Sequence, residues 1–277
     1  MESSLVTDPI LSCPQCNRAG TLALEFRALS VVRATCNACG LSVPTVEGIP
    51  DLARHIPIEN VKKNVSLIQR VNNSRFFSFY YDKPVWRPFL TRIGSWLSMA
   101  EEAEIILEYS ALRDSLNVAD LACGTGRYAR AFARRCPRGR VYGVDLSVNM
   151  LREARRESCR AALPNITLLR GDIHRLPFPD GSIDRVNCCG VLHLFANTKP
   201  VWREIARVLA PKGIFTGWVL TYAPNAFSRI QERLRDRIFL HLFKPEQLAA
   251  DLAQVGLVDF GHEQHHLWLL FKAVKAS

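Results

Sequence analysis

From residue 117 to residue 220, short apolar segments alternate with segments of helical periodicity. A chain that alternates in this way is expected to form a parallel, doubly wound α/β sheet, with its ligand at the carboxyl ends of the strands. The predicted strands are 117–123, 139–146, 165–173, 182–193 and 212–220, and the predicted helices are 126–136, 148–161 and 198–209. The segment 262–275 is predicted to supply the last strands of the sheet.

The first predicted strand ends in a glycine turn that opens the first helix. The turn, Gly124-Thr-Gly126-Arg-Tyr-Ala129, matches the pattern Gly-x-Gly-x-x-Ala. Dinucleotide-binding enzymes show the same pattern, so the motif alone leaves both a dinucleotide and S-adenosylmethionine open as ligands.

Charge favours the second ligand. A dinucleotide places its anionic pyrophosphate at the N-terminus of this helix, whereas S-adenosylmethionine carries a sulfonium and an ammonium group and no phosphate. Asp120 lies before the turn, at the end of the strand. Its carboxylate would repel a pyrophosphate and attract the cationic amino-acid part, so we expect S-adenosylmethionine.

Two further acids end the next two predicted strands. Asp145 is placed to accept hydrogen bonds from both ribose hydroxyls, and Asp172 is placed to accept one from the adenine amine. The alternative is that each acid is an ordinary helix N-cap. Three acids at the ends of three successive strands favour the ligand interpretation.

Cysteines are concentrated near the N-terminus, in two Cys-x2-Cys pairs separated by nineteen residues. Two such turns bring four thiolates together in the tetrahedron that structural zinc prefers. The segment between the pairs alternates as a β-hairpin does. The alternative is two disulfides, which are disfavoured because the chain is expected in a reducing, intracellular compartment. The predicted zinc ligands are Cys13, Cys16, Cys36 and Cys39.

The motifs of the second half together resemble a class I S-adenosylmethionine-dependent methyltransferase of the ubiquinone/menaquinone type. The matching stretches are "DLACGTGRYA", "VYGVDLSVNML", "GDIHRLPFPDGSIDRV", "GVLHLF", "WREIARVLAPKGIF" and "FKPEQLAADLAQVGL". The resemblance implies a Rossmann-like, seven-stranded methyltransferase sheet. It implies donor contacts from Asp120, Ala122, Cys123, Gly124, Gly126, Asp145, Leu146, Asp172, Ile173 and Cys188.

One of these positions departs from the family. The family often has glycine where this chain has Ala122, and we expect this small change to leave donor binding intact.

The N-terminal "CPQC…CNACG…VEGIPDL" resembles the zinc ribbon of a small activator subunit that partners eukaryotic methyltransferases. Fused to such a domain, it resembles plastid and bacterial enzymes of uncharacterised small-molecule type, and also ribosomal RNA guanine-N1 methyltransferases. The block that typically follows the ribbon in the RNA group is absent here, which favours a small molecule. The predicted domains are a ribbon at 1–55, a linker at 56–74 and a methyltransferase domain at 75–277.

Residues for the methyl acceptor are less well specified. His193 follows the fourth strand and is a candidate base or orienting group; the alternative is a structural histidine. Tyr80 and Tyr81 resemble the family's aromatic lid, and Tyr81 is the second catalytic candidate. Trp218 and Tyr222 are candidate walls of the acceptor pocket. The alternative for all four aromatic residues is that they pack in the core. The apolar face of a predicted helix within 225–243 is interpreted as packing on the core. His262, His265 and His266 are not expected to bind metal.

Composition sets broader bounds. The net charge of +10, with arginines gathered at 127–160, is compatible with nucleic acid but is interpreted as a solvated surface. No apolar run approaches the roughly 20 residues of a membrane span. Without a secretory signal, the chain is expected in the cytoplasm, as a monomer or homodimer.

The leading hypothesis is therefore an S-adenosylmethionine-dependent methyltransferase that acts on a hydrophobic or aromatic small-molecule metabolite, with a structural zinc ion. The alternative is a ribosomal or transfer RNA base methyltransferase that uses the ribbon to recognise RNA. A non-catalytic methyltransferase-like module is the third hypothesis, disfavoured because all three acids are retained.

Overall fold

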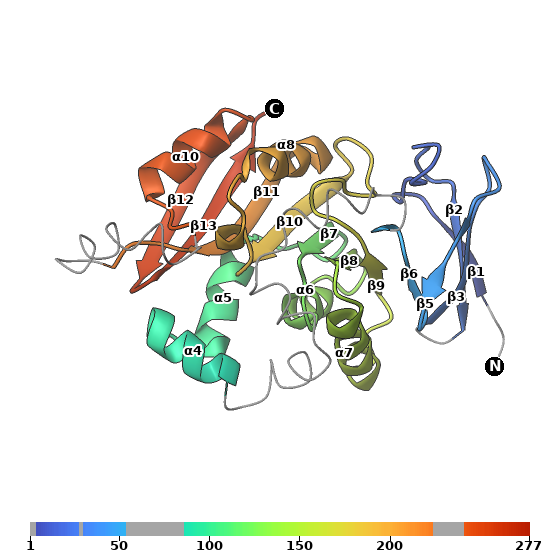
Figure 1. Ribbon diagram of the computed structural model, residues 1–277, viewed down its shortest axis with the longest axis horizontal. Helices are drawn as coiled ribbons and strands as arrows, with labels where there is room; N and C mark the ends of the chain where they lie inside the picture. The colour runs from blue at the N-terminus through green and yellow to red at the C-terminus, as the bar shows by residue number, and fades with distance from the viewer. Residues whose placement is uncertain (1–3, 28–29, 54–85, 224–240) are drawn as a thin grey trace.

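The structure is a computed structural model that describes residues 4–27, 30–53, 86–223 and 241–277. A four-stranded antiparallel sheet near the N-terminus packs beside a larger sheet that has helices on both faces (Figure 1). The proposed linker 56–74 lies outside the described residues.

The larger sheet has seven strands in the order β12-β13-β11-β10-β7-β8-β9. Neighbouring strands from β9 to β11 are parallel, and β13 is antiparallel to both β11 and β12. The strands are β7 (Asn117–Leu121), β8 (Arg140–Asp145), β9 (Ile166–Arg170), β10 (Ile183–Cys189), β11 (Leu209–Leu220), β12 (Leu257–His265) and β13 (Trp268–Lys275). The predicted doubly wound α/β fold with seven strands is confirmed.

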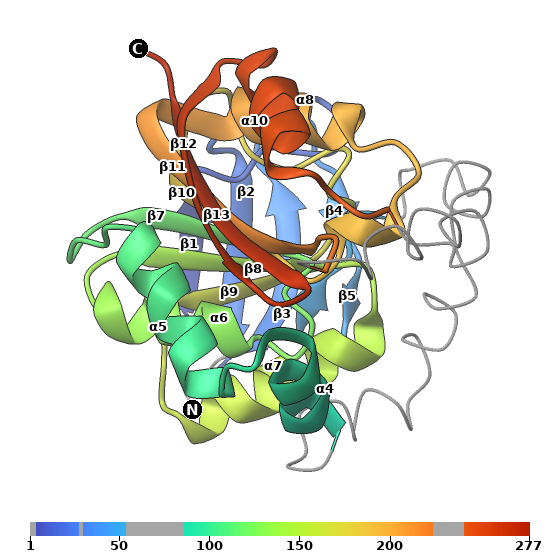
Figure 2. The same ribbon diagram turned by 90° about the vertical axis from the view of Figure 1, so that its left-hand side faces the viewer.

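Helices cover the sheet on two sides. In Figures 1 and 2, α8 and α10 lie on one face, and α5, α6 and α7 lie on the other. The helices are α4 (Trp86–Ser95), α5 (Met99–Tyr109), α6 (Arg127–Arg135), α7 (Val148–Arg160), α8 (Lys199–Val208) and α10 (Pro245–Ala253), with a 3-10 turn η2 (Leu192–Leu194). None of the helices in the described part of the chain has the length and apolar character needed to cross a bilayer.

The N-terminal sheet has the order β1-β2-β3-β4. Its strands are β1 (Ser4–Asp8), β2 (Leu22–Arg27), β3 (Ser30–Cys36) and β4 (Ser42–Val43), and a short hairpin, β5 (Thr45–Val46) and β6 (Ile49–Pro50), follows. The predicted hairpin is the antiparallel pair β2–β3. Below, "the ribbon" means residues 4–53 where described.

The ribbon packs against both faces of the large sheet at its β9 edge. On the α8 and α10 face, Leu11, Leu22 and Leu24 join one buried cluster with Tyr142 and Phe178. On the α7 face, Ile49 joins a second cluster that includes Leu151, Ala154 and Leu168.

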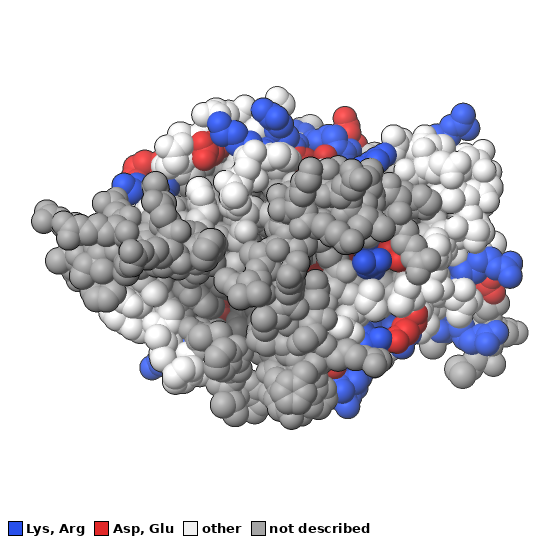
Figure 3. Space-filling model, viewed as in Figure 1, with Lys and Arg blue, Asp and Glu red and all other residues white. Residues whose placement is uncertain are grey.

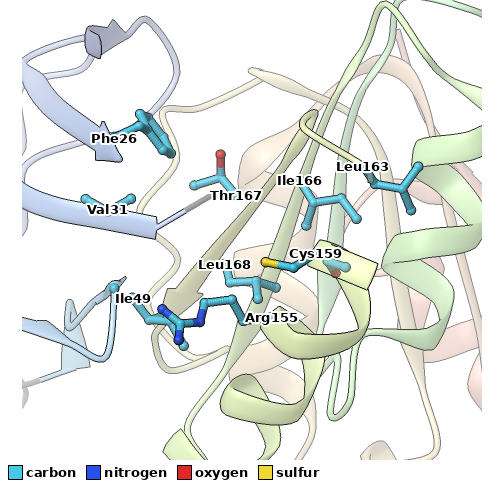
Figure 4. Close-up of a pocket in the computed structure, with 11 residues that line it drawn as sticks. Phe26, Val31, Ile49, Arg155, Cys159, Leu163, Ile166, Thr167 and Leu168 are labelled. Atoms are coloured by element: carbon cyan, nitrogen blue, oxygen red, sulfur yellow. The ribbon is translucent and has the colours of Figure 1, made fainter. Parts of the chain in front are cut away.

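The ribbon packs at this edge because the connection between β9 and β10 leaves the sheet uncovered. In a doubly wound sheet this connection normally carries a covering helix, but residues 171–182 contain no helix. The ribbon supplies the missing layer, so the two parts share one core. Figure 4 shows the side chains of Phe26, Val31 and Ile49 facing those of β9 and α7 across a cleft.

Candidate functional site

The glycine turn after β7 lies where the sequence predicts it, at the carboxyl ends of the parallel strands. Ala122, Gly124 and Gly126 all have positive φ values, of 50°, 55° and 73°. The Gly124 amide donates to Asp145 Oδ2 at 2.8 Å. A Cβ atom added at Gly124 would meet no atom of the described residues within 4 Å. The described part of the chain therefore leaves space at this position of the turn.

Asp120 is the most deeply buried of the three predicted acids, at 1% exposure. Its Oδ2 accepts the Ala129 amide at 2.9 Å, and its Oδ1 accepts the Asn187 side-chain amide at 2.7 Å. Because Gly126 has no side chain with which to cap α6, Asp120 does so from the preceding strand. Burial raises the pKa of Asp120 to about 7, despite these hydrogen bonds.

That pKa weakens the electrostatic argument made from the sequence. A carboxyl group that is partly protonated near neutral pH repels a phosphate less than a full charge would. The charge of Asp120 alone therefore does not decide between the two ligands.

Asp145 ends β8, opposite the turn. Besides Gly124, it accepts the Ser147 amide at 2.8 Å through Oδ1. Burial raises the pKa of its carboxyl group. The cap of α7 is Ser147, whose side chain accepts from Met150, so Asp145 is not an ordinary N-cap. Each carboxylate oxygen retains a further lone pair with which to accept from a ligand hydroxyl.

Asp172 follows β9 and pairs with His174, which sequence reasoning did not single out. Asp172 Oδ1 lies 2.7 Å from His174 Nδ1. Burial tends to raise the pKa of Asp172, but the bonds from His174 outweigh it and the pKa is lowered. The same hydrogen bond raises the pKa of His174. No helix follows Asp172 within 171–182, so the N-cap alternative does not apply.

The other predicted donor residues are mostly buried in the core clusters next to these strand ends. Cys123, Ile173 and Cys188 are buried, at 8%, 6% and 0% exposure. Burial raises the pKa of the Cys188 thiol, so it stays protonated. Leu146 is half-buried.

His193 lies in η2 beyond β10, at 8% exposure. Its ring stacks on Trp218 at 5.8 Å between centroids, and Trp218 stacks on Trp268 at 3.8 Å. Among the described residues, His193 Nδ1 has no hydrogen-bond partner. Burial lowers the pKa of His193 to about 4, so the imidazole is neutral at physiological pH.

A polar chain behind these rings was not foreseen. Trp218 Nε1 donates to the Tyr128 hydroxyl at 3.2 Å, and that hydroxyl donates to the fully buried Glu102. Glu102 comes from α5 and Tyr128 from α6. Nothing in the local sequence marks them as partners.

Several acceptor-side predictions lie outside the described residues, namely Tyr80, Tyr81 and the segment 225–240. Tyr222 is described and half-buried, with Lys244 Nζ 5.4 Å from its ring centroid. His265 contacts Glu263, and His266 stacks on Trp96.

The four ribbon cysteines come together as predicted. Their sulfur atoms all lie within 4.8 Å of one another, and the four residues are Cys13, Cys16, Cys36 and Cys39. No other cluster of possible metal ligands occurs in the described ranges. All four thiols are free, so the disulfide alternative does not hold.

Comparison with known proteins identifies the larger fold. Residues 119–216 match the family model described as "Methyltransferase domain". That segment of the chain therefore corresponds to a methyltransferase domain. A solved phosphoethanolamine N-methyltransferase 2 of Haemonchus contortus, in complex with S-adenosylmethionine, superposes with a TM-score of 0.60 at 19% identity, over 76% of this chain and 59% of that one. At that identity the likeness shows the fold.

Two relatives extend the comparison. An uncharacterized chloroplastic methyltransferase of Arabidopsis thaliana is 29% identical over 97% of this chain and 79% of its own length. A demethylmenaquinone methyltransferase of Listeria monocytogenes is 40% identical over 35% of this chain, which is 41% of its own length. The expected cytoplasmic location stays a prediction, since the plant relative's name places that protein in the chloroplast.

Proposed function

We propose that the protein methylates a hydrophobic or aromatic small molecule, with the donor held at the carboxyl ends of β7, β8 and β9. The observation that supports the acceptor proposal is the buried stack formed by the rings of His193, Trp218 and Trp268. Stacked aromatic rings and one neutral imidazole suit an apolar, flat acceptor with a single polar group.

In this proposal each acid of the donor site has its own role. Asp145 accepts from the ribose hydroxyls, and Asp172 accepts from the adenine amine. Asp120 fixes the glycine turn through α6 and places its charge near the cationic amino-acid part. Gly124 leaves room for the ligand above the turn, and the bound donor supplies a methyl group on a sulfonium.

The residues then have to align the acceptor and exclude water. A bound donor would pass its methyl group to an acceptor lone pair and leave as a neutral thioether, so positioning would contribute most to the rate. His193 has too low a pKa to be an efficient general base at pH 7. We assign it to orienting the acceptor through a hydrogen bond, with the acceptor proton passing to solvent.

The ribbon is proposed to bind one structural zinc ion. The sulfur atoms of Cys13 and Cys39 are 3.7 Å apart, and those of Cys16 and Cys36 are 3.8 Å apart. A tetrahedral site with zinc–sulfur bonds of about 2.3 Å requires sulfur atoms about 3.8 Å apart. With four protein ligands, no position is left for substrate.

The surface supports a small molecule over RNA. On the face in Figure 3, basic and acidic side chains of the described residues are interspersed. Arginines of α6 and α7 and the loop between them pair with acids, as in Arg135–Glu104, Arg138–Asp114, Arg156–Glu153 and Arg160–Glu157. Paired charges offer phosphates little net attraction.

The test supplies the purified protein with methyl-labelled S-adenosylmethionine and separate fractions of a cell extract. We expect label in organic-soluble small molecules, each gaining the mass of one methylene group, and none in RNA. His193→Ala should lower turnover while donor affinity stays unchanged. Label in RNA would favour the base-methyltransferase alternative and contradict this proposal.

A further inference from the structure

Arg170, the last residue of β9, joins the ribbon to the donor site. Its Nη1 donates to Asp51 Oδ2 at 2.8 Å, and its Nε donates to the backbone oxygen of Leu146 at 3.1 Å. One guanidinium therefore contacts both the ribbon and the residue that follows Asp145.

The ribbon end of this contact is fixed. Asp51 is 0% exposed. Its backbone amide donates to the backbone oxygen of Pro44 at 2.7 Å, and its Oδ1 accepts the Ala53 amide at 3.2 Å. The next amide, of Leu52, donates to the Arg170 oxygen at 2.9 Å. The Asp51 carboxylate is thus held against β9 by backbone as well as by charge.

The donor end is the turn that carries Asp145. Asp145 and Arg170 are register partners on β8 and β9, and the Gly171 amide donates to the Asp145 oxygen at 3.1 Å. The backbone of this turn is therefore held from the β9 side. On the other side, the Asp145 carboxylate accepts a hydrogen bond from the Gly124 amide of the glycine turn.

An apolar contact reaches the glycine turn as well. Ile49, at the end of the ribbon, shares a buried cluster with Cys123, which lies between Ala122 and Gly124. Figure 4 shows Ile49 beside Leu168 and Arg155, where the ribbon meets α7. Ribbon residues thus support both turns that the donor is proposed to touch.

We propose that Asp51 and Arg170 are positioning residues for donor binding, and that through them the ribbon sets the geometry of the Asp145–Leu146 turn. The inference rests on the proposed assignment of Asp145 to the ribose. Neither residue is proposed to touch the donor. A fixed carboxylate accepts two hydroxyl hydrogen bonds with less loss of freedom than a loose one.

Arg170→Lys separates the two contacts. Lysine keeps a positive charge opposite Asp51 but lacks the second donor of the guanidinium fork. We expect the Kd for S-adenosylhomocysteine, measured by calorimetry, to rise by about three- to thirtyfold. The KM for the donor should rise in parallel while kcat changes little. Asp51→Asn should act in the same direction.

Glu47→Gln is the matched control. Glu47 also joins the ribbon to the large sheet's α7, through Arg152 at 2.6 Å, and its contacts among the described residues are with Arg152 rather than with the Asp145 turn. The Glu47–Arg152 and Asp51–Arg170 ion pairs both join the ribbon to the large sheet and its helices. If holding these parts together is their only role, Glu47→Gln and Arg170→Lys should change thermal stability and donor affinity to a similar extent. The proposal requires the affinity change to be confined to the Asp51 and Arg170 variants.

A donor analogue that lacks both ribose hydroxyls completes the test. Its affinity should be the same in the wild-type protein and in Arg170→Lys, since the positioned carboxylate has nothing to accept. Asp145→Asn checks the underlying assignment: if it leaves S-adenosylhomocysteine binding unchanged, the ribose proposal fails and this inference with it. If Asp145→Asn weakens binding but Arg170→Lys does not exceed Glu47→Gln, only the positioning role is overturned.

Discussion

At the residue scale, the two glycines of the donor turn have different reasons to be glycine. Both have positive φ, but a Cβ at Gly124 meets open space, whereas one at Gly126 would lie 3.0 Å from the Ala154 Cβ on α7. Under the proposed function, Gly124 leaves room for the ligand, whereas Gly126 allows the close packing of α7.

Substituting each glycine separates these roles. We expect Gly124→Ala to lower stability by only about 1 kcal/mol, from backbone strain, and to weaken S-adenosylhomocysteine binding strongly because the methyl group occupies ligand space. Gly126→Ala should lower stability by about 2–3 kcal/mol, because steric crowding adds to the strain. Urea unfolding and calorimetry measure the two effects, and equal binding losses at matched stability would contradict the distinction.

Ala122 shares the positive φ of its neighbours, at 50°. Alanine accepts this conformation at modest cost, which accounts for the departure from the glycine usual in the family. Ala122→Gly removes the strain but gains unfolded-state entropy, so its stability should stay within about 1 kcal/mol of wild type. Ala122→Val should be clearly destabilised in urea, because a β-branched residue rarely adopts positive φ.

Asp120 gives the donor proposal a pH signature. Its pKa of about 7 is set by burial, and a bound cation nearby would favour the carboxylate and lower that pKa. Donor binding at pH 7 should therefore release a fraction of a proton. Calorimetry in buffers of different ionisation enthalpy measures it, and Asp120→Asn should abolish it. Proton uptake would show that the charged groups lie elsewhere.

At the element scale, α5, α6 and β11 are linked through Glu102, Tyr128 and Trp218. The polar chain crosses a buried aromatic layer, so its members depend on one another. Tyr128→Phe should lower the free energy of unfolding by about 1–3 kcal/mol, because a buried carboxylate loses a donor. Adding Glu102→Gln to that variant should recover part of the loss. Additive effects in urea titrations would mean that the pair is not coupled.

The same elements show what the sequence could predict. The periodicity of the apolar residues and the positions of the glycines were sufficient to predict β7, α6, β8 and α7, because the residues within each of these elements specify it. For the same reason the sequence predicted that Asp145 ends a strand and that Gly124 lies in the turn after β7, and both positions are seen in the structure. Trp268 and Glu102 were missed because their partners lie far away in the sequence, and only the closed sheet brings them together.

At the scale of the whole molecule, residues of the ribbon share a buried cluster with the large sheet. The sequence predicted a small ribbon domain at 1–55, but paired cysteines and the linker pattern carry no information about how that part docks. The segment 171–182 has the composition of a loop, and this was the available sign that β9 and β10 would lack a covering helix. An uncovered apolar face needs another element to bury it.

This shared core determines how the protein should respond to loss of the proposed zinc. Elemental analysis should give one zinc ion per chain, and a strong chelator should remove it. Because Leu11, Leu22 and Leu24 belong to the same buried cluster as Tyr142 and Phe178, loosening the ribbon also exposes the methyltransferase core. Chelation, or Cys16→Ser, should therefore lower the Tm of a single cooperative transition by several degrees and weaken donor binding.

Cys159→Ser removes an exposed cysteine outside the cluster and should leave both zinc content and Tm unchanged. A separate low-temperature transition for the ribbon, with the main transition unmoved, would show that the two parts fold independently.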